Sequence, residues 1–462
     1  MAQLRLDEIA LRTGGRIEQG NPSSLFSSFN IDSRLSRPGE LFFAIVAKRN
    51  GHGFVLDAFA KGARGAVVSQ PIPPVSPALA LVRVSDTVSA LQALAGSVLA
   101  EHGPTVIGVT GSIGKTTTKE FIASLLSVRF KVLKSEGNFN NLLGLTLSLL
   151  KLQPGQQAAV LEMGTSAPGE IRTLTRIAPP DIAVITNINP VHLEFFHSLE
   201  AIASAKKEIL EGAKKDATAV LNGDDPLVQK IGRDWRGRRL TFGFSPACDI
   251  RASAIRTLGT DGMTFEIRLE GRAQRVHFPF FYEEYLSNLL AAVGVSHALS
   301  LPFEEMVGQI PRLTPFSGRG GLIQLGRGLR LIDDSYNSNP KALEAALKGL
   351  ASLPAKRRIA VLGDMLELGP AETEFHRRAG RQVAENGWNL LLAVGPLASH
   401  VADGAVAAGL PKDKILTFST SDEAAARISG LVEDGDLILV KGSRGMKTER
   451  VVERLKDDFK ES

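Results

Sequence analysis

Apolar residues in the first hundred positions occur both in short runs and at helical spacing. Short apolar runs bounded by polar residues predict strands at 41–46, 65–69 and 81–84. Apolar residues that recur every three or four positions predict helices at the start of the chain, at 54–61 and at 88–100. The proline-rich loop 70–77 lies between two of these elements, so we place the first border later, at 101–104. This pattern predicts a small α/β domain over residues 1–103.

From residue 104 onward, apolar strands alternate regularly with helices. Strands are predicted at 105–110, 158–164, 181–188 and 218–225, and helices from Thr117 and over 199–212. Such alternation is typical of a parallel, doubly wound sheet. Residues 248–281 interrupt it with alternating polar and apolar positions around Asp261-Gly262 and Glu270-Gly271, which predicts antiparallel hairpins. Over 104–314 we therefore expect a mostly parallel sheet with an antiparallel insert.

The alternation resumes after Arg312. Strands are predicted near 329–333, 358–362, 390–394 and 436–441. Asn339 is suited to cap a helix whose first residue is Pro340. The pattern predicts a second α/β domain of ordinary size over 315–462. The chain has 462 residues, enough for three domains of roughly 150 residues each, so the predicted fold class is α/β with three domains.

Composition and charge narrow the class of protein. Apolar residues make up 44% and charged residues 22%, a globular balance. Lys and Arg (54) exceed Asp and Glu (49) only slightly and are scattered, so nucleic acid is not an expected partner. There is no run of eighteen apolar residues and no secretion signal, so we expect a cytoplasmic protein without membrane insertion. The lone Cys248 cannot form an intramolecular disulfide, and no Cys/His cluster offers a zinc site.

The strongest chemical signal is the segment 105–121, TVIGVTGSIGKTTTKEF. An apolar strand, a glycine loop and a helix follow in the order that a phosphate-binding loop requires. In such a loop backbone amides surround the phosphates, Lys115 reaches the β- and γ-phosphates, and the Thr116 hydroxyl can hold Mg²⁺. The usual first glycine would stand at Val109, so this loop is a shortened variant; the alternative is an accidental glycine turn. The predicted nucleotide-binding residues here are Thr110, Gly111, Ser112, Ile113, Gly114, Lys115, Thr116 and Thr117.

Two further groups follow predicted strands. Glu162 lies near the end of strand 158–164, where a carboxylate can bind a metal beside the phosphates, because ligands collect at the carboxyl ends of strands in open α/β sheets. His192 follows the next strand in the chain, and we expect the two groups at adjacent strand ends to meet near one metal. The alternatives are a capping carboxylate and a loop histidine without a ligand role. Lys206, taken alone, is most simply a solvated surface lysine.

Several segments occur in the order seen in the Mur ligases, which the chain resembles over essentially its whole length. They are GSIGKTTTK, EGNFNNLLG (136–144), LEMGTSAPGEI, NINPVHLEFF, SAKKEI and NGDD. Members of this family join an amino acid or dipeptide to a UDP-muramoyl peptide, using ATP to make an acyl phosphate that the incoming amine attacks. The resemblance implies a UDP-sugar domain, a central phosphate-loop domain that binds ATP, and a closing Rossmann-like domain.

The same resemblance implies roles for single residues. Lys115 and Thr116 would bind the phosphates of ATP and Mg²⁺, and Glu162 and His192 would hold a second metal. Lys206 matches the family lysine that is carbamylated and then resembles a carboxylate ligand. Asn138 and Asn141 in EGNFNNLLG are expected to bind substrate.

Other segments narrow the choice within the family. The segments 31–45 and 50–54 resemble the UDP-binding domain of the third- and fourth-step ligases, which implies that Ser33, Arg34 and His52 bind substrate. The segments 331–343, 361–369 and 438–449 look like the fourth-step type, whose substrates are UDP-N-acetylmuramoyl-tripeptide and D-alanyl-D-alanine. The alternative is the third-step type, which adds a diamino acid to the UDP-muramoyl-dipeptide, but its DNPR-like motif is absent.

The loop that begins at Asp334 offers hydrogen bonds to a small dipeptide or to the ribose of ATP. We expect Asp334 to bind the nucleotide, and we expect substrate contacts from Ser335, Tyr336, Asn337 and Asn339. The alternative is an Asx-rich turn that caps the next helix, and both can hold together.

Arg319, in FSGRGG, matches the family arginine that reaches the phosphates from the closing domain; the alternative is an exposed surface arginine. The segment 281–288, FYEEYLSN, departs from the family run of glycine-x-histidine-asparagine that contacts adenine, and only Asn288 matches. Tyr282 and Tyr285 either stack on adenine or belong to the core.

These expectations combine into one mechanism. ATP phosphorylates the terminal carboxylate of the tripeptide, the amine of D-alanyl-D-alanine displaces phosphate, and the catalytic groups are Lys115, Lys206, His192 and Arg319. A hinge near 312–318 is expected to close on substrate, in a monomer. The rival interpretations are a nucleotide-dependent switch, a folyl- or cyanophycin-type ligase, and an inactive paralogue.

Overall fold

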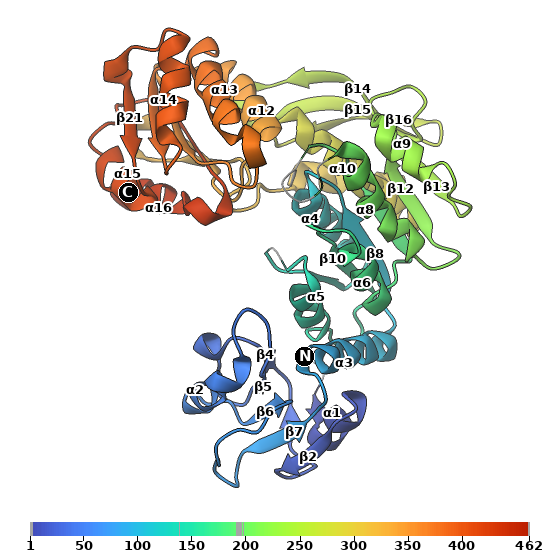
Figure 1. Cartoon of the computed structure of the whole chain (residues 1–462). Helices are drawn as coiled ribbons and strands as arrows, with labels where there is room; N and C mark the ends of the chain where they lie inside the picture. The colour runs from blue at the N-terminus through green and yellow to red at the C-terminus, as the bar shows by residue number, and fades with distance from the viewer. Residues whose placement is uncertain (1–2, 138, 191–195, 197, 461–462) are drawn as a thin grey trace.

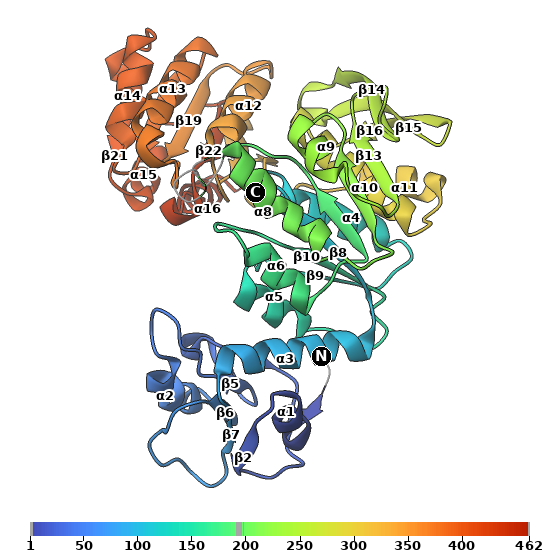
Figure 2. The ribbon, with the colours of Figure 1, turned by 45° about the vertical axis from the view of Figure 1, so that its right-hand side comes forward.

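The computed structural model describes residues 3–137, 139–190, 196 and 198–460. Its three larger sheets occupy successive parts of the chain, and these parts form an open arc with the middle part at the bend (Figure 1). A turned view shows α3 (Thr87–His102) lying between the N-terminal and middle parts (Figure 2). No helix among the described residues has the length and apolar character needed to cross a membrane.

The N-terminal part contains a five-stranded sheet in the order β2-β7-β6-β5-β4. The strands are β2 (Arg16–Gln19), β4 (Phe29–Asn30), β5 (Leu41–Phe43), β6 (Gly65–Val68) and β7 (Ala80–Arg83), and all but β2 are parallel to their neighbours. A separate pair joins β1 (Leu4–Arg5) to β3 (Leu25–Phe26). The helices are α1 (Leu6–Arg12), α2 (Val55–Ala60) and α3. The strands and helices predicted for this part are confirmed.

The middle part is built on a nine-stranded sheet in the order β16-β15-β14-β13-β12-β11-β8-β10-β9. Its strands are β8 (Thr105–Thr110), β9 (Val132–Lys134), β10 (Ala158–Glu162), β11 (Ile182–Ile185), β12 (Thr218–Asn222), β13 (Arg239–Gly243), β14 (Ile250–Thr257), β15 (Met263–Leu269) and β16 (Arg272–Phe278). In the order of the sheet, the neighbours from β9 through β10, β8, β11, β12 and β13 to β14 all pair in parallel. Strand β15 pairs antiparallel with both β14 and β16, which forms the two hairpins. The mostly parallel sheet with an antiparallel insert is thus confirmed.

Helices cover both faces of this sheet. They are α4 (Lys115–Leu126), α5 (Leu142–Leu149), α6 (Glu170–Ile177), α8 (Leu199–Glu211), α9 (Pro226–Gly232), α10 (Glu283–Ala298) and α11 (Phe303–Gln309). The apolar side chains of α4 and α10 share one core cluster on one face, and those of α5, α6 and α8 belong to a second cluster on the other. The sheet is doubly wound, as predicted. Helix α4 begins at Lys115, two residues earlier than expected, because Gly114 already adopts the left-handed N-cap conformation.

One expectation about neighbouring strands was wrong. Strand β8 lies between β10 and β11 and pairs with both, so Glu162 and the segment after β11 do not follow adjacent strands. After β8 the chain forms β9 and β10 on one side of β8 and then crosses to form β11 on its other side. The consecutive strands β10 and β11 are therefore separated in the sheet by β8. His192 itself lies outside the described residues. The crossing point is where open α/β sheets bind ligands.

The C-terminal part has a six-stranded sheet in the order β17-β18-β22-β19-β20-β21. Its strands are β17 (Gly321–Gln324), β18 (Arg330–Asp334), β19 (Arg358–Gly363), β20 (Leu390–Val394), β21 (Ile415–Phe418) and β22 (Leu437–Lys441). Only β17 is antiparallel to its neighbour. The helices are α12 (Pro340–Ala351), α13 (Glu372–Glu385), α14 (Ala398–Ala407), α15 (Ser421–Ile428) and α16 (Glu449–Asp458). Asn339 caps α12 by accepting a hydrogen bond from the Ala342 amide, as predicted.

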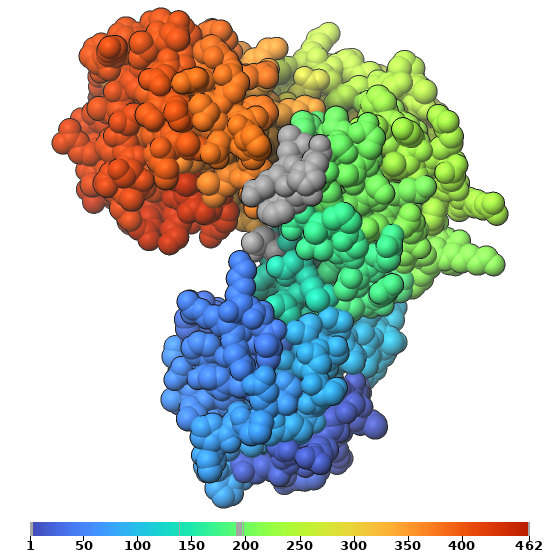
Figure 3. Space-filling view, viewed as in Figure 1, coloured from blue at the N-terminus to red at the C-terminus, as the bar shows by residue number. Residues whose placement is uncertain are grey.

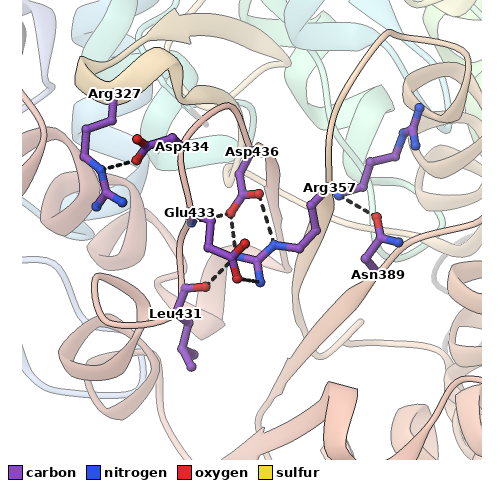
Figure 4. A network of polar contacts seen from close by, with 8 residues as sticks. Arg327, Arg357, Asn389, Leu431, Glu433, Asp434 and Asp436 are labelled. Carbon is purple, nitrogen blue, oxygen red and sulfur yellow. Dashed lines mark hydrogen bonds and ion pairs between the residues drawn. The ribbon is translucent and has the colours of Figure 1, made fainter.

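A polar network joins the amino ends of the parallel strands in this C-terminal sheet (Figure 4). Arg357 donates two hydrogen bonds, of 3.0 and 2.7 Å, to the carboxylate of Asp436, and a third to the carbonyl of Leu431. The Asp436 side chain is 1% exposed, and its pairing with Arg357 offsets part of the cost of taking the carboxylate out of water. The network lies at the amino ends of β19 and β22, opposite the carboxyl ends, where open α/β sheets bind ligands.

Candidate active site

A cavity of about 1070 Å³ lies between the middle and C-terminal parts. The phosphate loop lines it from one side, and the carboxyl ends of β18 and β22 with the start of α12 line it from the other. In the space-filling view a hollow also opens between the C-terminal and N-terminal parts (Figure 3). The site therefore lies where two sheets turn their carboxyl edges toward each other.

Two glycines of the phosphate loop are required by close packing. Gly111 has φ +150°, and a Cβ there would lie 1.9 Å from the Thr186 hydroxyl oxygen. Gly114 has φ +84°, and a Cβ there would lie 2.2 Å from the Asn288 side-chain oxygen. A side chain at either position would displace a neighbour, and at Gly114 it would also strain the left-handed backbone. Asn288, predicted from its match to the family, is thus placed directly against the loop.

The segment after β11 holds the loop from the other side. The Ile113 amide donates to the Asn187 side chain at 2.9 Å, and the Ser112 hydroxyl donates to the Asn189 carbonyl at 3.0 Å. Lys115 folds back over the loop, with its ammonium 2.8 Å from the Gly111 carbonyl oxygen. Sequence reasoning missed Asn187 and Asn189, although both stand in the NINP segment that it had singled out.

Thr116, Glu162 and Asn140 form a polar group at the base of the cavity. The Thr116 hydroxyl donates to one oxygen of Glu162 at 2.8 Å, and the Asn140 amide donates to the other at 2.9 Å. Glu162 is 3% exposed. Asn140 was not predicted: of the asparagines in EGNFNN, the sequence analysis selected Asn138 and Asn141, and the contact of Asn140 with Glu162 is tertiary. The structure brings two of the predicted metal-binding residues, Thr116 and Glu162, into direct contact.

These oxygens suit Mg²⁺, which prefers hard oxygen ligands and is usually held by one or two protein groups, phosphates and water. In the described part of the chain, no group of three or more His, Cys, Asp or Glu side chains is arranged so that it could hold a metal ion. A hydroxyl beside a single carboxylate is too few ligands for an all-protein site. It fits an ion whose remaining ligands come from a phosphate chain bound on the loop.

Positive charge gathers around this carboxylate. Burial lowers the pKa of the Lys115 ammonium; the nearby Glu162 partly offsets this effect, and Arg319 adds to it. Burial also holds the pKa of Lys206 well below its ordinary value, and Lys115 acts in the same direction. Lys206 is 3% exposed, which excludes the alternative of a solvated surface lysine. Cations that depress one another's pKa in a closed space indicate a site built for a polyanion.

Arg319 reaches this site from the segment that precedes the C-terminal sheet. Its guanidinium donates to the Thr116 hydroxyl at 3.1 Å and lies 4.0 Å from the centre of the Tyr336 ring. It is therefore not an exposed surface arginine. Lys341 makes a second connection between the same two parts, to the Asn189 side chain at 3.1 Å.

The loop after Asp334 uses most of its polar groups internally. Asp334 is paired with Lys441 at 2.6 Å, although burial raises the pKa of its carboxyl group. The Ser335 hydroxyl donates to Asp333, the Asn337 side chain accepts from the Ser338 amide, and Asn339 caps α12. Asp334, Tyr336, Asn337 and Asn339 also line the cavity, whereas Ser335 does not. The loop is thus both a capping turn and part of the wall.

The other predicted substrate residues that the structure describes do not line the central cavity. Arg34 is paired with Asp32 at 2.7 Å in the N-terminal part, where Ser33 is buried beside it. The His52 ring accepts hydrogen bonds from the amides of Ser69 and Gln70, at 2.9 and 3.1 Å. Asn141 caps α5 through the Gly144 amide. Asn138, like His192, lies outside the described residues.

Tyr282 and Tyr285, the two candidates for stacking on adenine, both line the cavity but are held by protein contacts. Tyr282 is buried in the core of the C-terminal part, and the Tyr285 hydroxyl donates to the Arg319 carbonyl at 2.8 Å. Thr110 and Gly111 do not line the cavity, whereas Ser112 through Thr117 do.

Comparison with known proteins adds independent findings. The family models described as "Mur ligase middle domain" and "Mur ligase, glutamate ligase domain" match residues 109–296 and 318–444. The UDP-N-acetylmuramoyl-tripeptide–D-alanyl-D-alanine ligase of Bacillus subtilis (strain 168) is 35% identical, over 92% of both chains. The enzyme of the same name from Escherichia coli (strain K12) is 32% identical, over 92% of this chain and 93% of its own.

Solved structures agree with these relatives. A crystal structure of MurF from Acinetobacter baumannii has a TM-score of 0.90 at 30% identity, over 99% of both chains. MurF from Thermotoga maritima in complex with ADP has a TM-score of 0.79 at 30% identity, over 93% of this chain and 97% of its own. A UDP-N-acetylmuramoyl-L-alanyl-D-glutamate–2,6-diaminopimelate ligase shares the fold alone, with a TM-score of 0.55 at 20% identity.

Proposed function

This chain belongs to the Mur ligase family, and from that premise we propose that it joins D-alanyl-D-alanine to UDP-N-acetylmuramoyl-tripeptide with cleavage of ATP to ADP and phosphate. The observation that carries the proposal is the contact between Arg319 and Thr116, which places a cation of the closing segment on the phosphate loop. A switch that only senses nucleotide would not need the large cavity that lies between the middle and C-terminal parts. The product belongs to peptidoglycan precursor synthesis.

The chemistry has two steps. A carboxylate oxygen of the tripeptide attacks the γ-phosphorus of ATP, the bond to the β,γ-bridging oxygen breaks, and ADP leaves. The neutral amine of D-alanyl-D-alanine then attacks the acyl carbon, inorganic phosphate leaves, and the amine loses a proton. Lys115 and Arg319 are placed to stabilise the charge on the transferring phosphoryl group. When bound, Mg²⁺ would be held by Thr116 and Glu162 and would neutralise the charge on the phosphates.

Lys206 has the properties that carbamylation needs. A neutral amine is the form that adds CO2, and burial favours the neutral form of Lys206. The carbamate would return a negative charge to a region rich in cations and supply an oxygen ligand for a second metal. In this proposal His192 contributes to the same metal.

The N-terminal part would bind the UDP-sugar, with its border at 103/104, and the C-terminal part, from 315, would bind the dipeptide. Ser33 and Arg34 are the proposed contacts to the nucleotide sugar, and Asn138 and Asn141 are further proposed substrate contacts. His52 would act by holding the backbone at Ser69 and Gln70, because its ring already accepts hydrogen bonds from these two amides. A hinge at 312–318 would let the C-terminal part close. We further propose a cytoplasmic monomer, since ATP and UDP-linked precursors are cytoplasmic substrates.

A coupled phosphate-release assay tests this function. Wild-type protein is expected to release phosphate only when ATP, the UDP-tripeptide and D-alanyl-D-alanine are all present. Single amino acids, offered with either the UDP-tripeptide or the UDP-dipeptide, should not replace the dipeptide. Release supported by a diamino acid and the UDP-dipeptide would favour the third-step reaction. Turnover of ATP that ignores all acceptors would contradict a ligase.

A further inference from the structure

The three tyrosines of the chain all lie against one short loop, residues 316–320. The Tyr285 hydroxyl donates to the Arg319 carbonyl at 2.8 Å. The Tyr282 ring lies so near Gly320 that a Cβ there would come within 2.5 Å of it. The Tyr336 ring faces the Arg319 guanidinium, with 4.0 Å between the ring centre and Cζ. Tyrosine is rare in this sequence, so this gathering around one arginine calls for a physical reason.

The backbone of the loop is held without the Tyr336 side chain. The Gly318 amide donates to the Asp333 carboxylate at 3.0 Å, and the Gly320 amide donates to the Asp333 carbonyl at 2.7 Å. The Tyr336 amide donates to the Gly318 carbonyl at 3.1 Å, a bond that any residue at 336 would keep. Replacing the Tyr336 side chain would therefore leave the path of the loop intact.

The guanidinium, by contrast, depends on the ring. Among the described residues the Arg319 side chain donates to Thr116 and makes a minor contact with the Tyr336 hydroxyl, and its buried Nε has no partner. Lys115, which carries the same charge, is near enough for Arg319 to lower its pKa. Asp334 attracts the guanidinium electrostatically, because Arg319 also lowers the pKa of that carboxyl group. The Tyr336 ring adds an attractive face in direct contact with the guanidinium.

A second arginine lies farther from the same ring. The Arg444 guanidinium is 5.8 Å from the Tyr336 ring centre, and it is already paired with Glu449 at 2.8 Å. The nearer and less neutralised cation is Arg319. The ring therefore acts mainly on Arg319.

We propose that Tyr336 is a positioning residue, whose aromatic face holds the Arg319 guanidinium over the phosphate loop before and during phosphoryl transfer. This inference rests on the proposed function and changes the role expected for Tyr336. Its hydroxyl is not needed to bind the dipeptide or the ribose, and its effect on the reaction passes through Arg319.

Four variants test this role in the phosphate-release assay: Tyr336→Phe, Tyr336→Leu, Arg319→Ala, and Arg319→Ala combined with Tyr336→Leu. Leucine removes the aromatic face and should lower kcat about tenfold, with little change in KM for D-alanyl-D-alanine. Phenylalanine keeps the ring and should retain most of kcat. In the Arg319→Ala background, Tyr336→Leu should cause no further loss, because the residue through which it acts is gone.

Two kinetic results would overturn the inference. The first is an equal loss in Tyr336→Phe and Tyr336→Leu with a raised KM for the dipeptide, which would assign the hydroxyl to substrate binding. The second is a full tenfold effect of Tyr336→Leu in the absence of Arg319. Thermal unfolding of each variant shows whether a loss of activity comes from misfolding. If Tyr336→Leu is misfolded, the comparison of Tyr336→Phe with wild type tests the inference.

A binding measurement separates this inference from the proposed reaction. Isothermal titration calorimetry should show that Tyr336→Leu and Arg319→Ala both lower the affinity for a non-hydrolysable ATP analogue. Their affinity for ADP should stay close to that of wild type, because a cation beside Thr116 contacts the γ-phosphate, which ADP lacks. This result is expected whatever the acceptor is. Unchanged affinity of Tyr336→Leu for the analogue, where Arg319→Ala is weakened, would overturn the inference and leave the ligase activity standing.

Discussion

The Arg319 guanidinium donates a hydrogen bond of 3.1 Å to the hydroxyl of Thr116, a residue 203 positions earlier in the chain. Thr116 in turn donates to Glu162 at 2.8 Å. One threonine hydroxyl thus joins a cation of the closing segment to the carboxylate at the end of β10. Any group that binds at Thr116, whether phosphate or metal, must replace or share these contacts, so nucleotide binding and the position of the C-terminal part are coupled.

Arg319→Lys should lower kcat by about 10²-fold or more, because an ammonium can neither stack as a planar group on Tyr336 nor reach Thr116 in the same geometry. Steady-state phosphate release measures this effect. Arg327→Lys, at an exposed position paired with Asp434 and away from the cavity lining, is the matched control and should stay within about twofold of wild type. A lysine variant as active as the control would show that Arg319 has no part in transfer.

Glu162→Gln should raise the Mg²⁺ concentration needed for half-maximal activity at least about tenfold. The amide keeps the shape of the side chain but removes the charge that faces Thr116. Titration of activity with Mg²⁺ at saturating ATP is the measurement. Glu136→Gln, whose carboxylate pairs with Lys151 in an exposed position, should leave the titration curve unchanged. Coinciding curves for the two variants would remove Glu162 from the metal site.

Lys206 is expected to carry a carbamate when CO2 is present. With ¹³C-labelled bicarbonate, wild-type protein should show a carbamate carbon signal by NMR that Lys206→Met lacks, and the variant should lose activity by orders of magnitude. Lys207→Met changes the neighbouring, half-exposed lysine and should keep both the signal and the activity. A signal that persists in Lys206→Met would place the carbamate elsewhere.

His52 should make the N-terminal part less stable in acid. Burial lowers its pKa below the ordinary 6.5, and nearby Arg83 acts in the same direction. The unfolded chain then takes up a proton before the folded one does, so stability is fully present above about pH 6.5 and falls as the pH drops through the folded pKa. Protonation of His52 would also turn its Nε2 from an acceptor into a donor, so the ring could no longer accept the hydrogen bonds of the Ser69 and Gln70 amides.

Thermal unfolding at pH 7.5 and at pH 5.5 checks this expectation. His52→Gln keeps an acceptor near those amides but cannot titrate, so its loss of stability between the two values should be smaller than that of wild type. An equal loss in both proteins would assign the acid sensitivity to other groups.

Asp436→Asn should lower the free energy of unfolding of the C-terminal part by about 3 kcal/mol, because it leaves the charge of Arg357 without its buried partner. Figure 4 also shows the matched control, Asp434→Asn, at the exposed pair with Arg327. That change should cost no more than about 0.5 kcal/mol. Denaturant unfolding followed by a probe in this part compares them, and equal costs would contradict a structural role for the buried pair.

The sequence predicted best those elements whose signal is local. The strand 105–110 matches β8 in both bounds, because a run of apolar residues leads directly into a recognisable loop. Asn339 and Pro340 predicted the start of α12 in the same way. Strands β17 and β21 were not predicted, because they are short and only partly buried and so lack a long apolar run.

Relationships between distant residues could not be predicted from local pattern. The insertion of β8 between β10 and β11 is a matter of pairing across the sheet, which no single segment encodes. Asn140 and Lys341 reach the site only through tertiary contacts. Lys206, taken alone, was most simply a surface lysine, and the packing of α8 against the sheet shows that it is buried. The resemblance to a family singled out Lys206 and Arg319, but it indicated neither the order of the strands nor the contacts of Asn140 and Lys341.

Helix α3 has a consequence for how the molecule can be divided. It packs against α1 on one side and against α5 and α6 on the other, and one apolar cluster runs through it from Leu4 to Ile231. Of the two clusters beside the C-terminal sheet, one is formed by the C-terminal part alone, and the other includes Tyr282 of the middle part. A cut at 103 would expose a continuous apolar core to water, whereas a cut near 315 would remove Tyr282 and the two aromatic residues packed beside it from one cluster. The first 314 residues should therefore move as one rigid unit in solution, and the C-terminal part should be the one that changes its position relative to this unit.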